Sequence, residues 1–324
     1  INVNQTSERA VVNWDTFNVA QGATVNFNQP SSSSTTLNYV KGADASVING
    51  TVNANGQVIL VNSNGVTFGK GAQVDAAGVV ASTMNISDKE FMDGKSTFKG
   101  NGKGVIINEG KITTNVEGGY IALLAPEVRN QGYLLAKKGT VAMAAGEQIT
   151  LNFQNNALIS VKVDTGTYNA LIENQRVVEV NGGLVVIAAG SANQLMASVI
   201  KNTGRISASS MVNNGGTIEL VANTVTQAGK VLANGKGANT QGGQINIVGN
   251  DITLAQNSKT SATGTAGGGQ VNIGLASTAV SGGTQVNTPA PSAQTNSQAQ
   301  ATIKANAANA KEQMANTVTV EQGD

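Results

Sequence analysis

The sequence predicts an all-β protein built as a parallel β-helix, with β-hairpin excursions beside the coils. Three observations lead to this fold class. Apolar and polar residues alternate in short runs, glycine pairs recur along the chain, and only 3% of the 324 residues are aromatic. Short alternating runs rich in Val and Ile and bounded by Gly and Asn are typical of strands. A recurring unit of a few dozen residues is typical of a solenoid, because one unit cannot bury its own apolar face.

Two repeated patterns define the expected coils. Gly-Gly followed by alternating apolar residues begins at positions 118, 182, 215, 242 and 268, and the last four lie 26 to 33 residues apart. An apolar-x-Asn-x-Gly-x-apolar pattern occupies residues 107–112, 128–134 and 200–206, and 225–231 is a weaker copy with Gln227 in the Asn position. Gly and Asn suit the corners because both tolerate a positive φ. Coils stacked about 4.8 Å apart share one core of small aliphatic residues, and about a dozen are expected.

Segments that break these patterns set the expected boundaries. Residues 85–104 are mostly polar and contain Phe91 and Phe98, and residues 150–180 alternate strongly around 164–167. Both are predicted to be excursions that cover part of the β-helix. The β-helical domain is expected over residues 1–285, followed by a low-complexity linker or the start of a downstream region over 286–324. The chain begins at Ile1 without Met, so the N-terminal edge is expected to be truncated.

Composition excludes several classes of function. The chain contains no Cys and no His, which excludes disulfides, thiolate metal sites, imidazole bases and Ser-His-Asp triads. The formal net charge is +1, and nucleic acid is therefore not expected as a partner. No apolar run approaches the roughly 18 residues of a membrane-spanning helix, so no transmembrane segment is predicted.

Sites for catalysis, metals or cofactors are also not predicted. Some β-helices are polysaccharide lyases or hydrolases that use clustered carboxylates, but the acidic residues here are scattered and are expected to be solvated. The glycine-rich segment 100–104 lacks the spacing of a phosphate-binding loop. Three matches to the N-glycosylation pattern, at 4–6, 49–51 and 85–87, are close to chance in a chain this rich in Asn.

One run has a second interpretation. Asn62-Ser63-Asn64-Gly65 lies between two apolar runs and is predicted to form a tight turn. Whether this turn is also a recognition element depends on its context. Residues 58–74 and 78–83, which contain it, closely resemble the filamentous-haemagglutinin-type N-terminal domain of two-partner-secretion exoproteins from Gram-negative bacteria.

Further segments support this resemblance, which covers about residues 1–250. Residues 10–19 match the family's Asn-Trp-x-x-Phe segment through Asn13, Trp14 and Phe17, and residues 27–33 match the polar segment that follows. Residues 85–88 with Phe91, and residues 151–153, lie where similar sequences occur in the family. Two departures concern the recognition residues: Ser63 replaces the family's usual Pro, and a second Asn-Pro-Asn-Leu motif is missing.

The resemblance implies a right-handed, single-stranded parallel β-helix that is not an enzyme. It also implies a POTRA-containing outer-membrane β-barrel transporter as partner, which recognises the unfolded chain in the periplasm. The chain then folds as a monomer, secreted or at the bacterial cell surface, and downstream regions contact host or neighbouring cells. Those regions are commonly an adhesin, a haemolysin, a haem-acquisition protein or a contact-dependent toxin carrier. The alternatives are a polysaccharide-active β-helical enzyme and a module that itself binds a receptor or a haem protein.

Overall fold

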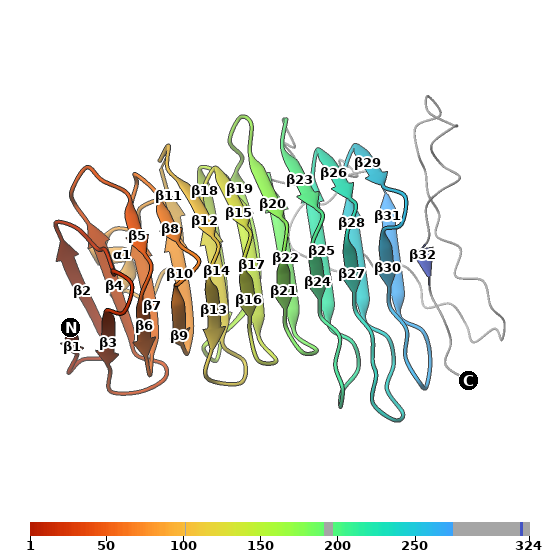
Figure 1. Ribbon diagram of the computed structural model, residues 1–324, viewed down its shortest axis with the longest axis horizontal. Coiled ribbons are helices and arrows are strands. Elements are labelled where there is room, and N and C mark those ends of the chain that lie inside the picture. The colour runs from red at the N-terminus through yellow and green to blue at the C-terminus, as the bar shows by residue number, and fades with distance from the viewer. Residues whose placement is uncertain (101, 191–196, 275–317, 320–324) are drawn as a thin grey trace.

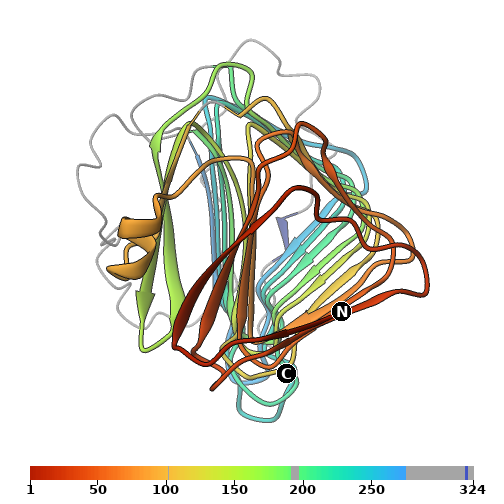
Figure 2. The same cartoon turned by 90° about the vertical axis from the view of Figure 1, so that its left-hand side faces the viewer.

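The computed structural model describes residues 1–100, 102–190, 197–274 and 318–319. Three parallel sheets wind around one long axis, and successive coils stack side by side along it (Figure 1). A complete coil contributes one strand to each sheet in turn. Viewed along the stack, the three sheets enclose a closed cross-section, and additional elements lie outside one of them (Figure 2). The predicted parallel β-helix with excursions is therefore confirmed.

The sheets are named here A, B and C in the order in which the chain enters them. Sheet A contains β1 (Asn2–Asn4), β3 (Thr24–Asn28), β6 (Thr51–Ala54), β9 (Gln73–Ala76), β13 (Lys111–Thr114), β16 (Tyr133–Leu135), β21 (Val177–Glu179), β24 (Arg205–Ser207), β27 (Lys230–Leu232), β30 (Lys259–Ser261) and β32 (Val318–Thr319). Sheet B contains β2 (Arg9–Trp14), β4 (Thr35–Val40), β7 (Gln57–Val61), β10 (Gly78–Ser82), β14 (Tyr120–Leu124), β17 (Thr140–Ala145), β22 (Leu184–Ala189), β25 (Thr217–Ala222), β28 (Gln244–Val248) and β31 (Gln270–Gly274). Sheet C contains β5 (Ser46–Ile48), β8 (Val66–Phe68), β12 (Val105–Asn108), β15 (Glu127–Asn130), β20 (Leu171–Asn174), β23 (Val199–Asn202), β26 (Thr224–Gln227) and β29 (Asp251–Leu254).

The interior of the coils is one continuous hydrophobic core. Alternate residues of each strand point inward, and in-register parallel pairing places like residues above one another. One such row passes through Val58, Val79, Ile121, Val141 and Val185. The row continues through Ile218 and Ile245. The narrow interior accepts few aromatic rings, which explains the aliphatic composition.

A second core lies outside the coils, on the outer face of sheet B. The excursions cover this face with helix α1 (Asp88–Met92) and a small antiparallel sheet of β11 (Thr97–Lys99), β18 (Gln148–Gln154) and β19 (Ala157–Thr165). Both excursions leave the coils between a strand of sheet B and the next strand of sheet C. Phe91 and Phe98 are fully buried against outward-facing residues such as Ile59 and Leu124. Strands β7, β10, β14 and β17 are consequently buried on both faces.

Local sequence signals shape the excursions. Ser87 caps α1 by accepting a hydrogen bond from the Glu90 N–H at 3.2 Å, which satisfies an amide left free by the helix. The β18–β19 hairpin turns through Asn155 and Asn156, whose φ angles are 49° and 64°. Two positive φ angles match the twist of the flanking strands. The Tyr39 hydroxyl accepts from the Ile86 N–H at 3.1 Å and joins the first excursion to sheet B.

The second excursion is shorter than the sequence predicted. The hairpin occupies residues 148–165, whereas residues 171–174 and 177–179 are β20 and β21 of the coils. Alternation runs through the whole segment, so it does not distinguish a hairpin strand from a coil strand. The predicted domain boundary at 285 and most of the 286–324 segment lie outside the described residues.

The Asn of the repeated pattern forms a ladder inside the corner between sheets C and A. The carboxamide nitrogens of Asn108, Asn130, Asn174 and Asn202 each donate to the carboxamide oxygen one coil further along, at 2.6–2.8 Å, and Gln227 is the last acceptor. All five side chains are buried. Because buried carboxamides need hydrogen-bond partners, the ladder supports the register of consecutive coils. Gln227 keeps the ladder intact despite its longer side chain.

Candidate functional site

The Asn62–Gly65 run forms the corner between β7 and β8, as the sequence predicted. The Gly65 N–H donates to the Asn62 carbonyl at 3.0 Å, which closes a four-residue turn. Asn62 Oδ1 accepts from the Asn64 N–H at 2.9 Å, so the Asn62 side chain caps the turn from inside. Gly65 has a φ of 120°, and a Cβ there would lie 3.0 Å from the Val105 carbonyl oxygen. A side chain at Gly65 would therefore strain the backbone.

Asn62 also ties the turn to the preceding coil. Its Nδ2 donates to the Asp44 carbonyl oxygen and to Ser46 Oγ, both at 3.0 Å. The residue is fully buried. Every polar atom of this side chain is therefore engaged within the fold, and its role in the folded domain is structural.

Ser63 and Asn64 are the exposed members of the turn. Asn64 Nδ2 donates to the Gly42 carbonyl oxygen at 3.0 Å, which links it to the previous coil from the surface. Within the described residues, the Ser63 hydroxyl makes no hydrogen bond, so Asn62 rather than Ser63 caps the turn. The turn thus survives where the family usually has Pro.

The N-terminal motif lies at the first coil. Trp14 ends β2 and packs its ring edge against Phe17, with ring centroids 5.4 Å apart and an interplanar angle of 77°. Trp14 Nε1 donates to Asn38 Oδ1 at 3.0 Å. Phe17 is buried in the core, Trp14 is half-buried against it, and Asn13 is exposed. The two rings thus join the core at the first coil.

The two motifs are separate in the structure. Trp14 belongs to the first coil, the turn follows β7 two strands further along sheet B, and no hydrogen bond or ring contact between them is found among the described residues. Sequence reasoning missed Asn38, a fully buried residue that fixes Trp14 and donates to the Thr36 and Ile59 carbonyls. The available signal was an Asn between the large apolar residues Leu37 and Tyr39 of one strand.

Other kinds of site were also sought in the described part of the chain. It contains no group of three or more acidic side chains placed to hold a metal ion. No helix in that part is long and apolar enough to cross a membrane. Some acidic residues form separate surface pairs, such as Lys138 with Glu117 at 3.1 Å. On sheet C, Arg129 pairs with both Glu127 and Glu173, and Glu173 also pairs with Lys201.

Relatives with curated names share this region. A heme/hemopexin-binding protein of Haemophilus influenzae is 27% identical over 230 residues, covering 69% of this chain and 25% of the relative. A second heme/hemopexin-binding protein of that species is 28% identical over 244 residues, covering 69% and 26%. The chain thus spans about a quarter of the length of the curated relatives it matches.

Solved structures share the fold. The HMW1 secretion domain of Haemophilus influenzae superposes with a TM-score of 0.68 at 26% identity, covering 83% of this chain and 73% of that one. The filamentous hemagglutinin secretion domain superposes with a TM-score of 0.50 at 18% identity, covering 81% and 88%, which supports the fold.

The family model for the TPS secretion domain matches residues 1–233. Proteins of this family are exported by two-partner secretion through the outer membrane to the cell surface, and membership implies a transporter partner. The coil architecture agrees with that match. The chain belongs to the TPS secretion-domain family.

Proposed function

We propose that a POTRA-containing outer-membrane β-barrel recognises this chain in its unfolded state and releases it on folding. The observation that carries the proposal is the burial of Asn62, whose side chain is fully engaged by Asp44 and Ser46. In an unfolded chain the whole Asn62–Gly65 run is accessible. In the folded domain only Ser63 and Asn64 remain exposed. Folding therefore removes half of the run from the transporter.

The fold also gives the release a direction. Each coil pairs with the previous one along three sheets, so coils that emerge first provide a template for those that follow. Trp14 and Phe17 pack together in the first coil, which supplies apolar surface for the coils that arrive later. Hydrogen bonds and apolar burial gained at the exit oppose backward movement of the chain. Export without an external energy source is then driven by folding.

A substitution at Asn64 separates recognition from folding. Asn64→Ala removes a surface hydrogen bond to the previous coil, which costs about 1 kcal/mol. We expect export in cells that carry the cognate transporter to fall several-fold, while urea unfolding of the purified domain shifts little. Unfolded chain accumulates in the periplasm. Secreted protein and periplasmic protein are both quantified by immunoblot.

Asn250 provides a matched control. It is an exposed Asn at a later corner between sheets B and C, and its Nδ2 donates to Asn223 Oδ1 at 2.9 Å. Asn250→Ala should cost a similar amount of stability and leave export unchanged. If both variants are exported equally well, the turn is an ordinary corner and the recognition proposal is wrong. Asn62→Ala is unsuitable here, because it removes buried contacts and lowers stability and export together.

We further propose that the domain is not an enzyme. Several carboxylates are engaged in structural contacts: Asp75 accepts from Thr113 Oγ1 at 2.8 Å, and Asp164 accepts from Thr150 Oγ1 at 2.5 Å. Burial alone would raise the pKa of Asp164, but hydrogen bonds from Lys162 and Thr150 outweigh it and hold that pKa below its usual value. A low pKa suits a structural carboxylate rather than a general acid. Assays with acidic polysaccharides should show no turnover above buffer.

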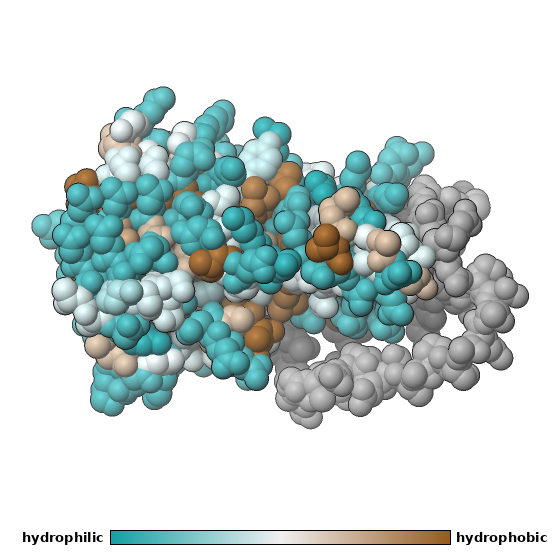
Figure 3. All heavy atoms as spheres, turned by 90° about the horizontal axis from the view of Figure 1, so that it is seen from below, coloured by the Kyte–Doolittle hydropathy of each residue, from teal (hydrophilic) through white to brown (hydrophobic). Residues whose placement is uncertain are grey.

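The longer protein is proposed to act at the cell surface, and the relatives favour a haem-protein ligand. Both curated relatives are named for heme/hemopexin binding. On the face shown in Figure 3, apolar side chains form separate patches among hydrophilic ones, so we place the ligand contacts downstream. Surface plasmon resonance on immobilised haem–hemopexin should detect binding of the full protein and no binding of residues 1–274.

We also propose that the domain is a monomer and that nucleic acid is not a partner.

A further inference from the structure

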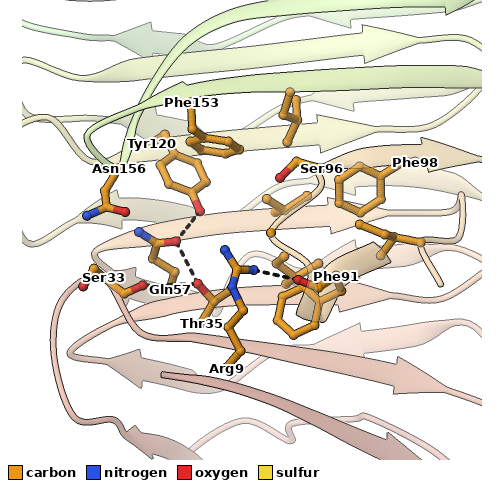
Figure 4. A pocket seen from close by; sticks show the side chains of 15 residues that line it. Arg9, Ser33, Thr35, Gln57, Phe91, Ser96, Phe98, Tyr120, Phe153 and Asn156 are labelled. Carbon is orange, nitrogen blue, oxygen red and sulfur yellow. Dashed lines mark hydrogen bonds between the residues drawn. The ribbon is translucent and has the colours of Figure 1, made fainter. Parts of the chain in front are cut away.

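A small pocket lies between the outer face of sheet B and the excursions (Figure 4). Its volume is about 80 Å³. An apolar cavity of about 150 Å³ accommodates benzene, and one water occupies about 30 Å³ of liquid. The pocket therefore encloses about three non-hydrogen atoms, and because it is partly open to solvent, a slightly longer ligand can project from it. Its lining comes from the first coil, four later coils and both excursions.

Arg9 supplies the only charge among the side chains that line the pocket. Its Nη1 donates to the Phe91 carbonyl oxygen at 3.0 Å, and the guanidinium carbon lies 5.0 Å from the centre of the Phe91 ring. No carboxylate pairs with Arg9 among the described residues. A guanidinium has five N–H donors, and this one uses a single donor. Its remaining donors suit two oxygens of one anion.

Gln57 supplies a second donor. Its Oε1 accepts from Thr35 Oγ1 at 3.0 Å and from the Tyr120 hydroxyl at 2.9 Å. Burial raises the pKa of Tyr120 above its usual value, so the hydroxyl stays protonated and donates. These two bonds orient the carboxamide with Nε2 free of any acceptor in the described chain. Gln57 is only 8% exposed, so this unpartnered donor is part of a built site.

The rest of the lining selects the shape of the ligand. The rings of Phe91, Phe98, Tyr120 and Phe153 form apolar walls, and Tyr120 and Phe153 meet edge to face with centroids 5.0 Å apart. An Asp or Glu that would repel an anion is not among the lining residues. One cation and apolar walls match a single negative charge on an apolar stem. Phosphate carries more charge and has no apolar part, so it fits less well.

We propose that this pocket binds a small monocarboxylate of two or three carbons, held by the Arg9 guanidinium and the Gln57 carboxamide, with its alkyl end against the aromatic rings. The site exists only in the folded domain, because its residues extend from position 9 to position 156. The unfolded chain in the periplasm therefore has no such site. A ligand of this kind stabilises the folded domain by mass action.

Titration of the purified chain with sodium propionate tests this site. Binding is followed by the Arg9 side-chain N–H resonance in NMR, with ionic strength held constant by sodium chloride. Propionamide, which has the same shape without the charge, and inorganic phosphate are titrated in parallel. We expect saturable shifts with propionate, and at least tenfold weaker binding of propionamide and phosphate. Shifts that match the chloride reference, or tighter binding of phosphate than of propionate, would overturn the proposal.

Variants locate the site. Arg9→Gln should weaken propionate binding at least tenfold, whereas Arg129→Gln, a half-exposed arginine on sheet C, should leave it unchanged. Because Arg9→Gln also removes the contact with Phe91, the filling variant Ser96→Leu is used beside it and leaves Arg9 in place. For Ser96→Leu, binding is read from aromatic-ring resonances and should be lost while the thermal midpoint is retained. Equal affinity in the wild type and Ser96→Leu would rule out this pocket.

Discussion

The early and late coils differ on one face only. An outward row of sheet B passes through Leu37, Ile59, Val80, Ala122 and Ala142, all buried beneath the excursions. The same row continues through Val186 to Glu219, Asn246 and Asn272, which are only partly buried. From β7 onward the inward rows on either side of it stay apolar, whereas β4 contributes Thr36 and Asn38 to them. The coil is therefore one structural unit along the chain. Its outward residues on sheet B are apolar where the excursions cover them and polar where they do not.

The largest expected effect follows from placing a charge in the covered part of that row. Ala142→Glu buries an uncompensated carboxylate, which costs about 3–5 kcal/mol, and overpacking adds about 1–3 kcal/mol. We expect circular dichroism at 25 °C to show that the purified variant is largely unfolded, or that it unfolds at a much lower urea concentration than the wild type. Asn272→Glu, in the same row of the uncovered part, should cost less than about 1 kcal/mol. Equal costs would mean that the excursions do not exclude water.

Truncation of the cover itself is the next largest effect. Phe98→Ala removes a fully buried ring between β11 and sheet B, which should cost about 3–5 kcal/mol. Val221→Ala on the uncovered face of β25 should cost about 1 kcal/mol or less. Hydrogen exchange should show faster exchange in β10 and β14 for Phe98→Ala alone. Faster exchange in the late coils as well would show that the cover stabilises the whole solenoid.

The carboxamide ladder should not distinguish the two regions, because it lies at a corner that both share. Asn130→Ala and Asn202→Ala each leave neighbouring carboxamides unpaired and should each cost about 1–3 kcal/mol. The unfolding free energies of the two variants, measured by urea titration, should agree within about 0.5 kcal/mol. A much larger cost at Asn130 would extend the difference between the regions beyond sheet B.

The smallest expected effect concerns Glu219, at the edge of the cover. Burial raises its pKa above the usual value, so the folded state favours the protonated form. The contribution of Glu219 to the stability of the folded domain is fully present below the pKa that it has in the unfolded chain. This contribution is lost as the pH rises through the pKa that Glu219 has in the folded domain. Glu219→Gln should therefore stabilise the domain at pH 7 by up to about 0.5 kcal/mol and leave it unchanged at pH 3. The difference between unfolding midpoints at the two pH values checks this; a gain at pH 3 would point to another cause.

The repeated patterns predicted the ladder's positions without predicting the ladder. Asn108, Asn130 and Asn202 were identified as corner residues that tolerate unusual backbone angles, yet each is a buried hydrogen-bonding group. Asn174 was missed because its corner lacks the following Gly and has Arg176 instead. The carboxamide is visible in sequence, but its partner lies one coil away and is set by register.

The candidate recognition turn shows the same division. Asn-Gly predicted the corner after β7, because these residues suit a tight turn. The sequence did not show that Asn62 is buried and Asn64 exposed, since Asp44, Ser46 and Gly42 of the previous coil decide it. The proposed experiment on Asn64 depends on that distinction.

The sequence by itself determined the coil: its strands, its corners and its aliphatic interior follow from a period of two and from Gly and Asn spacing. Continuous apolar runs such as Tyr120–Leu124 also carried the signal of burial on both faces. Only the tertiary structure decided what covers those runs, where the hairpin ends and that Arg9, Gln57 and Tyr120 line one pocket. Local sequence patterns indicate whether a side chain is buried. They do not predict which side chain it contacts when the contacting residue is more than a hundred positions away in the sequence.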